Sequence, residues 1–414
     1  MQLSSLRGHS AELVRIIRKS PQPGDAIASE YFRSKKYLGG ADRRFISGLV
    51  FQTLRTLSLS EAIAAHLSLE DVVHGAHLLQ DNSENVDLSF IGDLPFHIQI
   101  NTQEWLLSST QKRWPDDSAD VWRAMMNSAP LVLRVNLRRV TRNSVLQKLV
   151  EEGIDCIIGP LSPAAIIVNQ RVNLQQHPLY TGGFVEVQDE GSQLIGYACA
   201  PNEDDNILDA CAGAGGKSLH LADIQSDKGR ITAHDIEWNR LKEVPTRANR
   251  AGIRSVWASV DDGRKQSRQP RAESQQLDAR HPTLYDIVLV DAPCSGMGTV
   301  RRLPMPKWRL NEASLKRHVR KQQSVLKEYA PHVREGGVLV YSTCSILPEE
   351  NERVIEHFLS EHPDFQPDPL APCFEKYGIH IPDLHTSASH MFQADPFHHG
   401  TDGLFMARMK KIPL

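Results

Sequence analysis

The chain opens with apolar residues at helical spacing. Within residues 1–85 this pattern is clear in AELVRIIRKS, DRRFISGLVFQTLRTL and SEAIAAHL. The next stretch, LLQDNSENVDLSFIGDLP, loses the periodicity and is typical of a linker. We therefore predict a helical domain over residues 1–85 with a linker after it.

Residues 96–185 combine two patterns. TQEWLLSSTQKRW and ADVWRAMMNS have helical spacing, whereas LVLRVNL, CIIGPL and AAIIVNQ are short apolar runs typical of strands. This order predicts linker helices followed by a small α+β module of RRM-like type.

Over residues 186–414 strand-like runs alternate with helical patterns. The runs are ILDAC, RITAHD, SVWASVD, YDIVLVDAP and GGVLVYSTCS. The alternation predicts an α/β domain with a mainly parallel, doubly wound, Rossmann-like sheet that binds ligands at the carboxyl ends of its strands. Two stretches interrupt the pattern: we predict a mobile loop over residues 264–283 and an irregular surface segment over residues 361–403.

Composition narrows the class of protein. The 414 residues are 40% hydrophobic and 23% charged, which fits a globular protein of two or three domains. No apolar run is long enough to span a membrane and the first residues lack a secretion signal, so we expect a cytoplasmic monomer with no membrane association. The six cysteines form no Cys-x-x-Cys pair, so we expect reduced thiols and no metal site.

Charge is unevenly distributed although the net charge is only −3. Residues 301–321 are rich in Lys and Arg and contain a single Glu. Such a segment suits a phosphate backbone, but a solvated basic helix face explains it equally well.

A glycine-rich turn, ILDACAGAGGKS, follows the first strand of the predicted sheet. A phosphate-binding loop of the Walker type needs glycine where this chain has Cys211, and the dinucleotide pattern needs a third glycine that is absent. What remains is a Rossmann-like first turn, in which backbone N–H groups and a helix N-terminus face a ligand.

Three strand-end acids accompany this turn. Asp235 lies about 20 residues past the turn, where a carboxylate accepts hydrogen bonds from ribose hydroxyls, and Asp262 and Asp291 end the next two strands. A single strand-end Asp is more often a helix cap, but three around one switch point favour a ligand site. S-adenosylmethionine fits them, because it has a ribose and a positive sulfonium but no phosphates.

Two cysteines follow adjacent strands. Cys294 lies in DAPCSG and Cys344 in YSTCSILPEEN, so their sulfurs can approach one cavity, whereas a lone cysteine is usually a small hydrophobe. A methyl donor beside a thiol suggests carbon 5 of cytosine, which becomes nucleophilic once a thiolate adds to carbon 6. Asp291 is placed to partner the ring nitrogen N3 if it carries or shares a proton. The residues alone do not assign the attacking cysteine.

The motifs DACAGAGGKS, DDGR, DAPCSGMGTVRRLPMPKW and YSTCSILPEENE together resemble the Sun-type RNA cytosine-5 methyltransferases, most closely the ribosomal RNA small subunit methyltransferase B group. The likeness covers roughly residues 100–414 and includes VQDEGSQL and DGLFMARMK. ADRRFISGLVFQTLR is similar to the NusB-like RNA-binding domain of that group. The resemblance implies an S-adenosylmethionine-dependent RNA methyltransferase.

The resemblance also implies residue roles. It makes Cys344 the nucleophile and gives Cys294 a role in product release. The implied donor pocket consists of Cys211, Ala212, Gly213, Ala214, Gly215, Gly216, Lys217, Asp235, Asp262 and Asp291. The chain departs from the family pattern at Ala214, where a proline is usual, which weakens the expected restraint on the turn.

RNA is the implied partner, with ribosomal RNA as the main expectation and transfer RNA as the alternative. We expect it to contact Arg301, Arg302, Lys307, Trp308 and Arg309, with the Trp308 ring either stacking on a base or packing internally. A third hypothesis is an inactive RNA-binding assembly factor that keeps the fold but not the chemistry.

Overall fold

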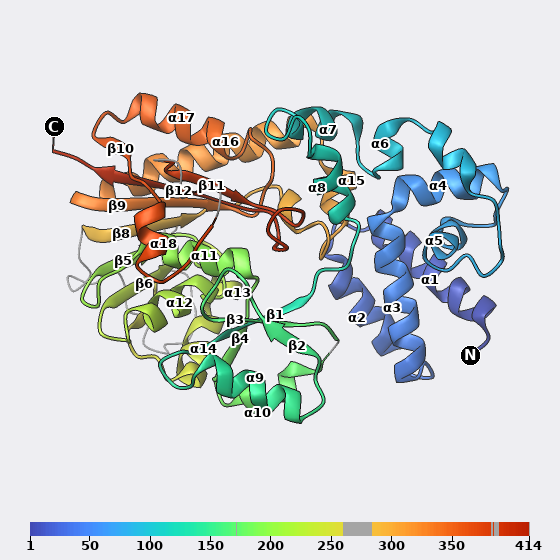
Figure 1. The fold of residues 1–414 in the computed structure, drawn as a ribbon, viewed down its shortest axis with the longest axis horizontal. Helices are drawn as coiled ribbons and strands as arrows, with labels where there is room; N and C mark the ends of the chain where they lie inside the picture. The colour runs from blue at the N-terminus through green and yellow to red at the C-terminus, as the bar shows by residue number, and fades with distance from the viewer. Residues whose placement is uncertain (171, 260–283, 382–383, 385–388, 414) are drawn as a thin grey trace, which may run out of the picture. The chain divides into compact units, whose positions relative to one another are not determined.

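The computed structural model describes residues 1–170, 172–259, 284–381, 384 and 389–413. The described chain forms two compact units. The first unit consists of Met1–Ala129, Ser295–Glu312 and Pro396–Gly400. The second consists of Pro130–Cys294, Ala313–Asp395 and Thr401–Leu414 (Figure 1). Asp262 and the loop predicted over residues 264–283 lie outside the described residues.

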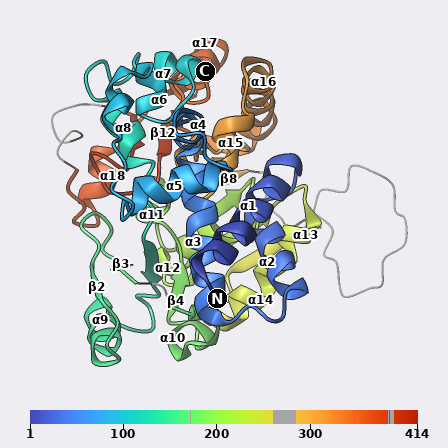
Figure 2. The same ribbon diagram turned by 90° about the vertical axis from the view of Figure 1, so that its right-hand side faces the viewer.

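The first unit is helical. Its helices are α1 (Leu3–Lys19), α2 (Gly24–Ser34), α3 (Gly40–Arg55), α4 (Leu57–His66), α5 (Val72–Gln80), α6 (Phe96–Gln99), α7 (Glu104–Thr110), α8 (Ser118–Ala124) and α15 (Met305–Arg309). Helices α1, α3 and α5 pack side by side (Figures 1 and 2). The buried stripe of α1 (Leu13, Val14 and Ile17) meets Ile46, Leu49 and Val50 of α3, because apolar residues three and four apart share one helix face. The helical pattern of the first part of the sequence is confirmed.

The stretch expected to be a linker is packed against this unit. Residues 89–93 form a short 3₁₀ turn, and Leu88, Phe90 and Leu94 contact the apolar cluster of Leu59, Ile63 and Leu78. Residues 96–129 also belong to this unit, whereas the sequence grouped them with the small α+β module. Local periodicity does not reveal these contacts, because a pattern within one segment does not report which other segments it packs against.

The second unit begins with a four-stranded antiparallel sheet in the order β2-β3-β1-β4. Its elements are β1 (Leu131–Val135), α9 (Arg142–Glu151), β2 (Cys156–Ile158), β3 (Ala165–Val168), α10 (Pro178–Thr181) and β4 (Val185–Val187). One face of the sheet buries Leu133, Ile166 and Val185 against Val145 and Leu149 of α9. The module is therefore α+β, as its strand-like runs predict.

An eight-stranded sheet forms the rest of this unit, in the order β10-β12-β9-β8-β5-β6-β7 with β11 paired to β12. Its strands are β5 (Asn206–Asp209), β6 (Arg230–His234), β7 (Val256–Ser259), β8 (Tyr285–Asp291), β9 (Val333–Thr343), β10 (Phe365–Pro367), β11 (Met391–Ala394) and β12 (Leu404–Lys411). Strands β5 to β9 are parallel and β12 joins β9 antiparallel. The predicted doubly wound sheet is thus confirmed, and its switch point lies between β5 and β8.

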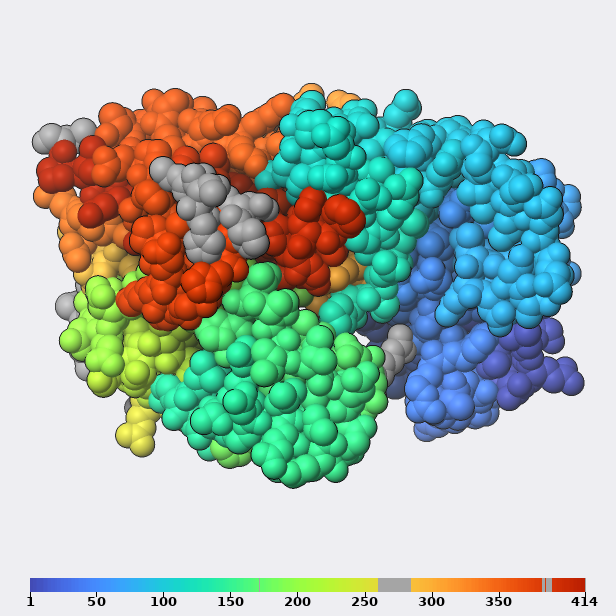
Figure 3. All heavy atoms as spheres, viewed as in Figure 1, coloured from blue at the N-terminus to red at the C-terminus, as the bar shows by residue number. Residues whose placement is uncertain are grey.

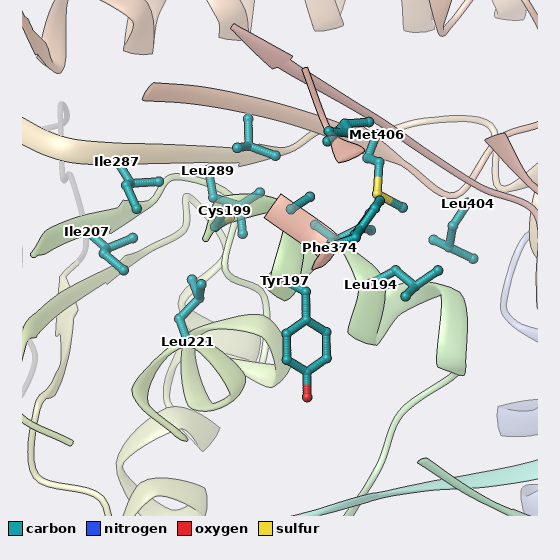
Figure 4. Close-up of a cluster of buried hydrophobic side chains, with 14 of the residues drawn as sticks. Leu194, Tyr197, Cys199, Ile207, Leu221, Ile287, Leu289, Phe374, Leu404 and Met406 are labelled. Atoms are coloured by element: carbon teal, nitrogen blue, oxygen red, sulfur yellow. The ribbon is translucent and has the colours of Figure 1, made fainter. Parts of the chain in front are cut away.

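Helices cover both faces of this sheet. One layer contains α11 (Glu190–Cys199), α12 (Gly216–Ile224), α14 (Glu243–Ala251) and α18 (Ala371–Glu375), and the other contains α16 (Glu312–Tyr329) and α17 (Glu352–Glu361). Alternate residues of β5 point to opposite layers: Ile207 joins the cluster of α11 and α12 (Figure 4), and Leu208 joins that of α16 and α17. In Figure 3 the orange atoms of this second layer lie along the upper edge of the view.

The segment 361–403 corrects a prediction, because it is not an irregular surface wrap. It supplies β10, α18 and β11, and Leu370 and Phe374 are buried in the core at 0% and 1% exposure. These elements are three to five residues long and lie among prolines, so no periodicity reveals them. Among the described residues, no helix combines the length and the apolar character needed to cross a membrane.

Candidate active site

The carboxyl ends of β5, β6, β8 and β9 converge at the switch point of the eight-stranded sheet. After β5 the chain turns sharply through Gly213 and Gly215, whose φ angles of 55° and 81° are left-handed. A side chain at Gly215 would also meet Val244 Cγ2 at 2.8 Å. Glycine is therefore required there, and the turn delivers the N-terminus of α12 to the switch point.

Asp235, which follows β6, fastens this turn. Its Oδ2 accepts a hydrogen bond from Gly213 N at 2.8 Å, and its Oδ1 accepts one from Glu237 N at 2.7 Å. Each carboxylate oxygen keeps a second lone pair for another donor, such as a ribose hydroxyl. The neighbouring Ile236 is 69% exposed, an apolar surface that sequence reasoning missed because one isoleucine after an acid carries no pattern.

Asp209, at the end of β5, is fully buried. Ser218 Oγ donates to its Oδ2 at 2.6 Å, while its Oδ1 has no hydrogen-bond partner among the described residues. Burial raises the pKa of Asp209 to about 7, although the Ser218 hydrogen bond opposes the rise. The sequence showed an acid just before the glycine turn but gave it no role, so this group was also missed.

Lys217 and Asp291 form an ion pair at the same switch point. Lys217 Nζ lies 2.6 Å from Asp291 Oδ2, and Ser342 Oγ donates to Asp291 Oδ1 at 2.8 Å. Burial acts to lower the pKa of Lys217, but the charge and hydrogen bond of Asp291 outweigh it and leave the pKa raised. Cys344 adds to the rise, so the ammonium lies within electrostatic reach of that sulfur.

Cys294 and Cys344 face each other. They follow β8 and β9, which are parallel neighbours with Asp291 opposite Ser342, and their sulfurs are 3.3 Å apart. Both are free thiols that are neither fully buried nor fully exposed. The structure thus brings the two sequence-predicted cysteines together beside Asp291.

Cys211 differs from this pair. Burial, followed by the charge of Asp291, raises the pKa of its thiol far above the usual range, and the side chain packs against the layer of α16 and α17. Ala212 packs against Ala233 and Val244. These two residues shape the turn through packing.

The residues expected to contact RNA lie in the first unit and have internal partners. Lys307 is 1% exposed and its Nζ donates to Asn101 O at 2.6 Å and to Arg55 O at 3.0 Å. Trp308 Nε1 donates to Leu54 O, Arg309 to Ile17 O and Arg301 to Gly400 O, while Arg302 is half-buried in the same segment. The structure therefore corrects the expectation for Lys307, whose ammonium is too deeply buried to reach a phosphate. For Trp308 it favours internal packing, one of the two expected alternatives.

Solved structures support the fold of the whole arrangement. The chain is similar to the methyltransferase homologue protein of Pyrococcus horikoshii, with a TM-score of 0.61 and 23% identity over 79% of this chain and 100% of that chain. Together with the switch-point turn, this similarity defines a Rossmann-like methyltransferase fold.

The family follows from sequence comparison. Residues 196–410 match the family described as 16S rRNA methyltransferase RsmB/F, and residues 103–175 match the ferredoxin-like domain of RsmF/B-like methyltransferases. The chain therefore belongs to the RsmB/F methyltransferase family.

Curated relatives agree. The chain is 34% identical over 311 residues to the probable ribosomal RNA small subunit methyltransferase B of Bacillus subtilis. The aligned region covers 74% of this chain and 66% of the relative. It is 31% identical over 315 residues to the corresponding protein of Synechocystis, which covers 76% of this chain and 67% of the relative. The matched part thus spans about two thirds of these relatives.

Proposed function

We propose that this protein is an S-adenosylmethionine-dependent RNA cytosine-5 methyltransferase that acts on small-subunit ribosomal RNA through a covalent cysteine adduct. The observation that carries the proposal is the pair of sulfurs of Cys294 and Cys344, 3.3 Å apart beside the glycine turn. Membership of the RsmB/F family and the names of the curated relatives support the substrate class.

The residues at the switch point fit the methyl donor. Asp235 has lone pairs for the ribose hydroxyls of the donor, and Ile236 offers an exposed apolar surface for its adenine. The left-handed glycines, Gly213 and Gly215, let the donor approach the backbone closely. Buried Asp209 Oδ1, without a partner among the described residues, is an acceptor within the same turn. When bound, S-adenosylmethionine supplies the methyl group.

Cys344 is the proposed nucleophile. Its sulfur bonds to carbon 6 of the cytosine, the ring loses its aromaticity, and carbon 5 gains the electron density that accepts the methyl group. A free thiol is only a few per cent ionised at neutral pH, so a nearby cation has to stabilise the thiolate. The ammonium of Lys217, held by Asp291, is that cation.

Asp291 and Cys294 are assigned to the proton-transfer steps of this mechanism. Asp291 Oδ2 accepts a hydrogen bond from Lys217 Nζ at 2.6 Å, and Asp291 is the group assigned to cytosine N3 as the sulfur adds. Cys294 lies in contact with the Cys344 sulfur and is assigned to product release. In this step the Cys294 sulfur takes the proton from carbon 5, and the electrons of that C–H bond re-form the ring double bond and expel Cys344 as a thiolate. The assignment of attack to Cys344 rests on the family resemblance.

RNA contact is proposed for the exposed basic face of α16. Lys316, Arg317, Arg320 and Lys321 are exposed there, and within the described residues none of them has an ion-pair partner. Burial raises the pKa of Cys211, and the charge of Lys321 partly offsets this rise. The basic face therefore lies close enough to the glycine turn to act on it electrostatically.

Salt dependence tests this face. Replacing Lys321 by Ala should lower the slope of log affinity against log salt concentration by about 0.7 to 0.9, the value of one phosphate contact. Binding is measured with a ribosomal RNA fragment by fluorescence anisotropy. Lys148→Ala removes an equally exposed charge from α9 as the control, and equal slopes for both variants would exclude α16 as the RNA surface.

The cysteine roles are tested with single variants and labelled RNA. Cys294→Ala should accumulate a protein–RNA adduct that survives denaturing electrophoresis, whereas Cys344→Ala should form no adduct and have no turnover. The reverse pattern would assign attack to Cys294. Absence of both an adduct and methyl transfer from the wild type, on ribosomal and transfer RNA alike, would favour the inactive assembly factor.

A further inference from the structure

A buried polar bridge connects the two loops that carry the cysteines. Glu350 is 0% exposed, and its two carboxylate oxygens accept different donors. Its Oε2 accepts from Ser345 Oγ at 2.6 Å and its Oε1 accepts from Gln322 Nε2 at 2.9 Å. Ser345 directly follows Cys344, so one end of the bridge holds the loop of that cysteine.

Gln322 completes the bridge from the other side. It is 0% exposed on α16, and its Nε2 also donates to Pro293 O at 3.2 Å. Both partners are acceptors, which fixes the orientation of the amide. Pro293 precedes Cys294, so the path from Cys294 to Cys344 runs through Gln322 and Glu350.

Further hydrogen bonds hold the Cys344 end in place. Ser345 Oγ accepts from Leu347 N at 3.1 Å, and Asn351 Nδ2 donates to Ser345 O at 3.0 Å. The Tyr341 hydroxyl donates to the backbone oxygen of Glu350 at 2.7 Å. Glu350 is thus anchored through its backbone while its side chain reaches the other two segments.

An apolar interior would have stabilised this region at least as well, because burying a carboxylate costs solvation free energy that its partners repay only in good geometry. A polar bridge does, however, fix positions that apolar packing leaves adjustable. Two sulfurs that must act on one base need this restraint, since a displacement of about 1 Å is worth roughly 10²-fold in rate.

We infer that Gln322 and Glu350 are positioning residues, which set the separation of the Cys294 and Cys344 sulfurs by tying Pro293 to Ser345. The inference rests on the proposed function for its catalytic consequence, but not for its geometric one. In the proposed mechanism Gln322 and Glu350 contact neither the cytosine nor the methyl donor, so their loss should change the rate of the chemical steps and leave substrate binding intact.

The geometric consequence is tested by coupling the two thiols with diamide, which takes up two hydrogens as the Cys294–Cys344 disulfide forms. The rate is followed by mass spectrometry of the linked peptides. Gln322→Leu should slow coupling at least tenfold, and Glu350→Gln, which keeps one acceptor oxygen, should have an intermediate rate. Tyr285→Phe, the matched control, removes a buried hydrogen bond to Thr232 that lies outside the bridge, and it should couple like the wild type even if its Tm falls.

The catalytic consequence is a split between kcat and KM. Gln322→Leu should lower kcat by 10- to 100-fold with both KM values within about twofold of the wild type. If it does not fold, Gln322→Met combined with Glu350→Met removes the bridge without leaving a buried charge unpaired. Wild-type coupling and kcat in a folded variant overturn the inference. Slower coupling in a protein without methyl transfer would retain the bridge and reject the proposed function.

Discussion

Asp209 is a carboxyl group whose protonation is set by its surroundings. Its pKa of about 7 in the folded protein lies above that of an exposed aspartate, chiefly because of burial. The folded state therefore binds a proton that the unfolded chain releases between about pH 4 and 7, so stability falls as pH rises through this window and levels off above it. Between pH 5.5 and 8 the loss is roughly 2 kcal/mol, from 1.36 kcal/mol per pH unit.

Asp209→Asn should remove this contribution. The amide keeps an acceptor for Ser218 and does not titrate, so the free energy of unfolding of the wild type should decrease relative to the variant as pH rises from 5.5 to 8. Urea titrations of both proteins at several pH values measure the difference. A difference that stays constant over this range would mean that the carboxyl group titrates normally.

Single residues also show where sequence reasoning ends. Cys294 and Cys344 could be paired from sequence because adjacent parallel strands end at one edge of a sheet. The burial of Lys307 could not be predicted, because a buried lysine and an RNA-binding lysine look the same within a basic stretch of sequence. The carbonyl group of Arg55, which accepts a hydrogen bond from Lys307, lies 252 positions away in the chain. Burial lowers the pKa of Lys307 to about 7.

At the scale of elements, the small antiparallel sheet restrains the glycine turn that follows β5. Arg247 of α14 donates to Ala214 O at 2.7 Å and is held by Glu186 of β4 at 2.9 Å. Arg134 of β1 donates to Gly216 O at 2.8 Å. These contacts restrain the turn at the position where the family pattern has proline and this chain has alanine.

Arg247→Ala should therefore weaken binding of S-adenosylmethionine about 5- to 10-fold, equivalent to roughly 1 kcal/mol. Isothermal titration calorimetry measures the change. The control is Arg250→Ala, which removes another partner of Glu186 that makes no contact with the turn. If both variants bind the donor equally well, the restraint comes from the glycine geometry alone.

The predictability of each element depended on its length and pattern. Strands β5 to β9 are four to eleven residues long, each contains apolar residues, and they alternate with helices, which is enough to predict a parallel sheet. β10 and β11 have three and four residues, and their pairing with β12 depends on contacts made only after the sheet forms. The sequence contained no local signal for them.

For the whole molecule, the order of segments in the chain does not match the two compact units. Residues 295–312 directly follow Cys294 yet belong to the first unit. Met305 is buried there in the apolar cluster of α1, α2, α3 and α5, and Trp308 packs against that cluster. Consecutive domains over residues 1–85, 96–185 and 186–414, as the sequence suggests, therefore do not coincide with the two units. Only contacts between distant positions define this division, and periodicity does not report them.

This division predicts the outcome of truncation. A chain that begins at Pro130 lacks the helices that bury Met305, Lys307 and Trp308, so segment 295–312 should expose an apolar surface and an unpaired lysine. We expect increased binding of a hydrophobic dye, aggregation and a lower Tm. Adding residues 1–129 as a separate chain should reverse these changes, because the missing contacts are not covalent.

Met305→Ser with Trp308→Ser in the truncated chain should reduce aggregation without restoring Tm. A truncated wild-type chain that stays monomeric with an unchanged Tm would show that segment 295–312 folds without the first unit.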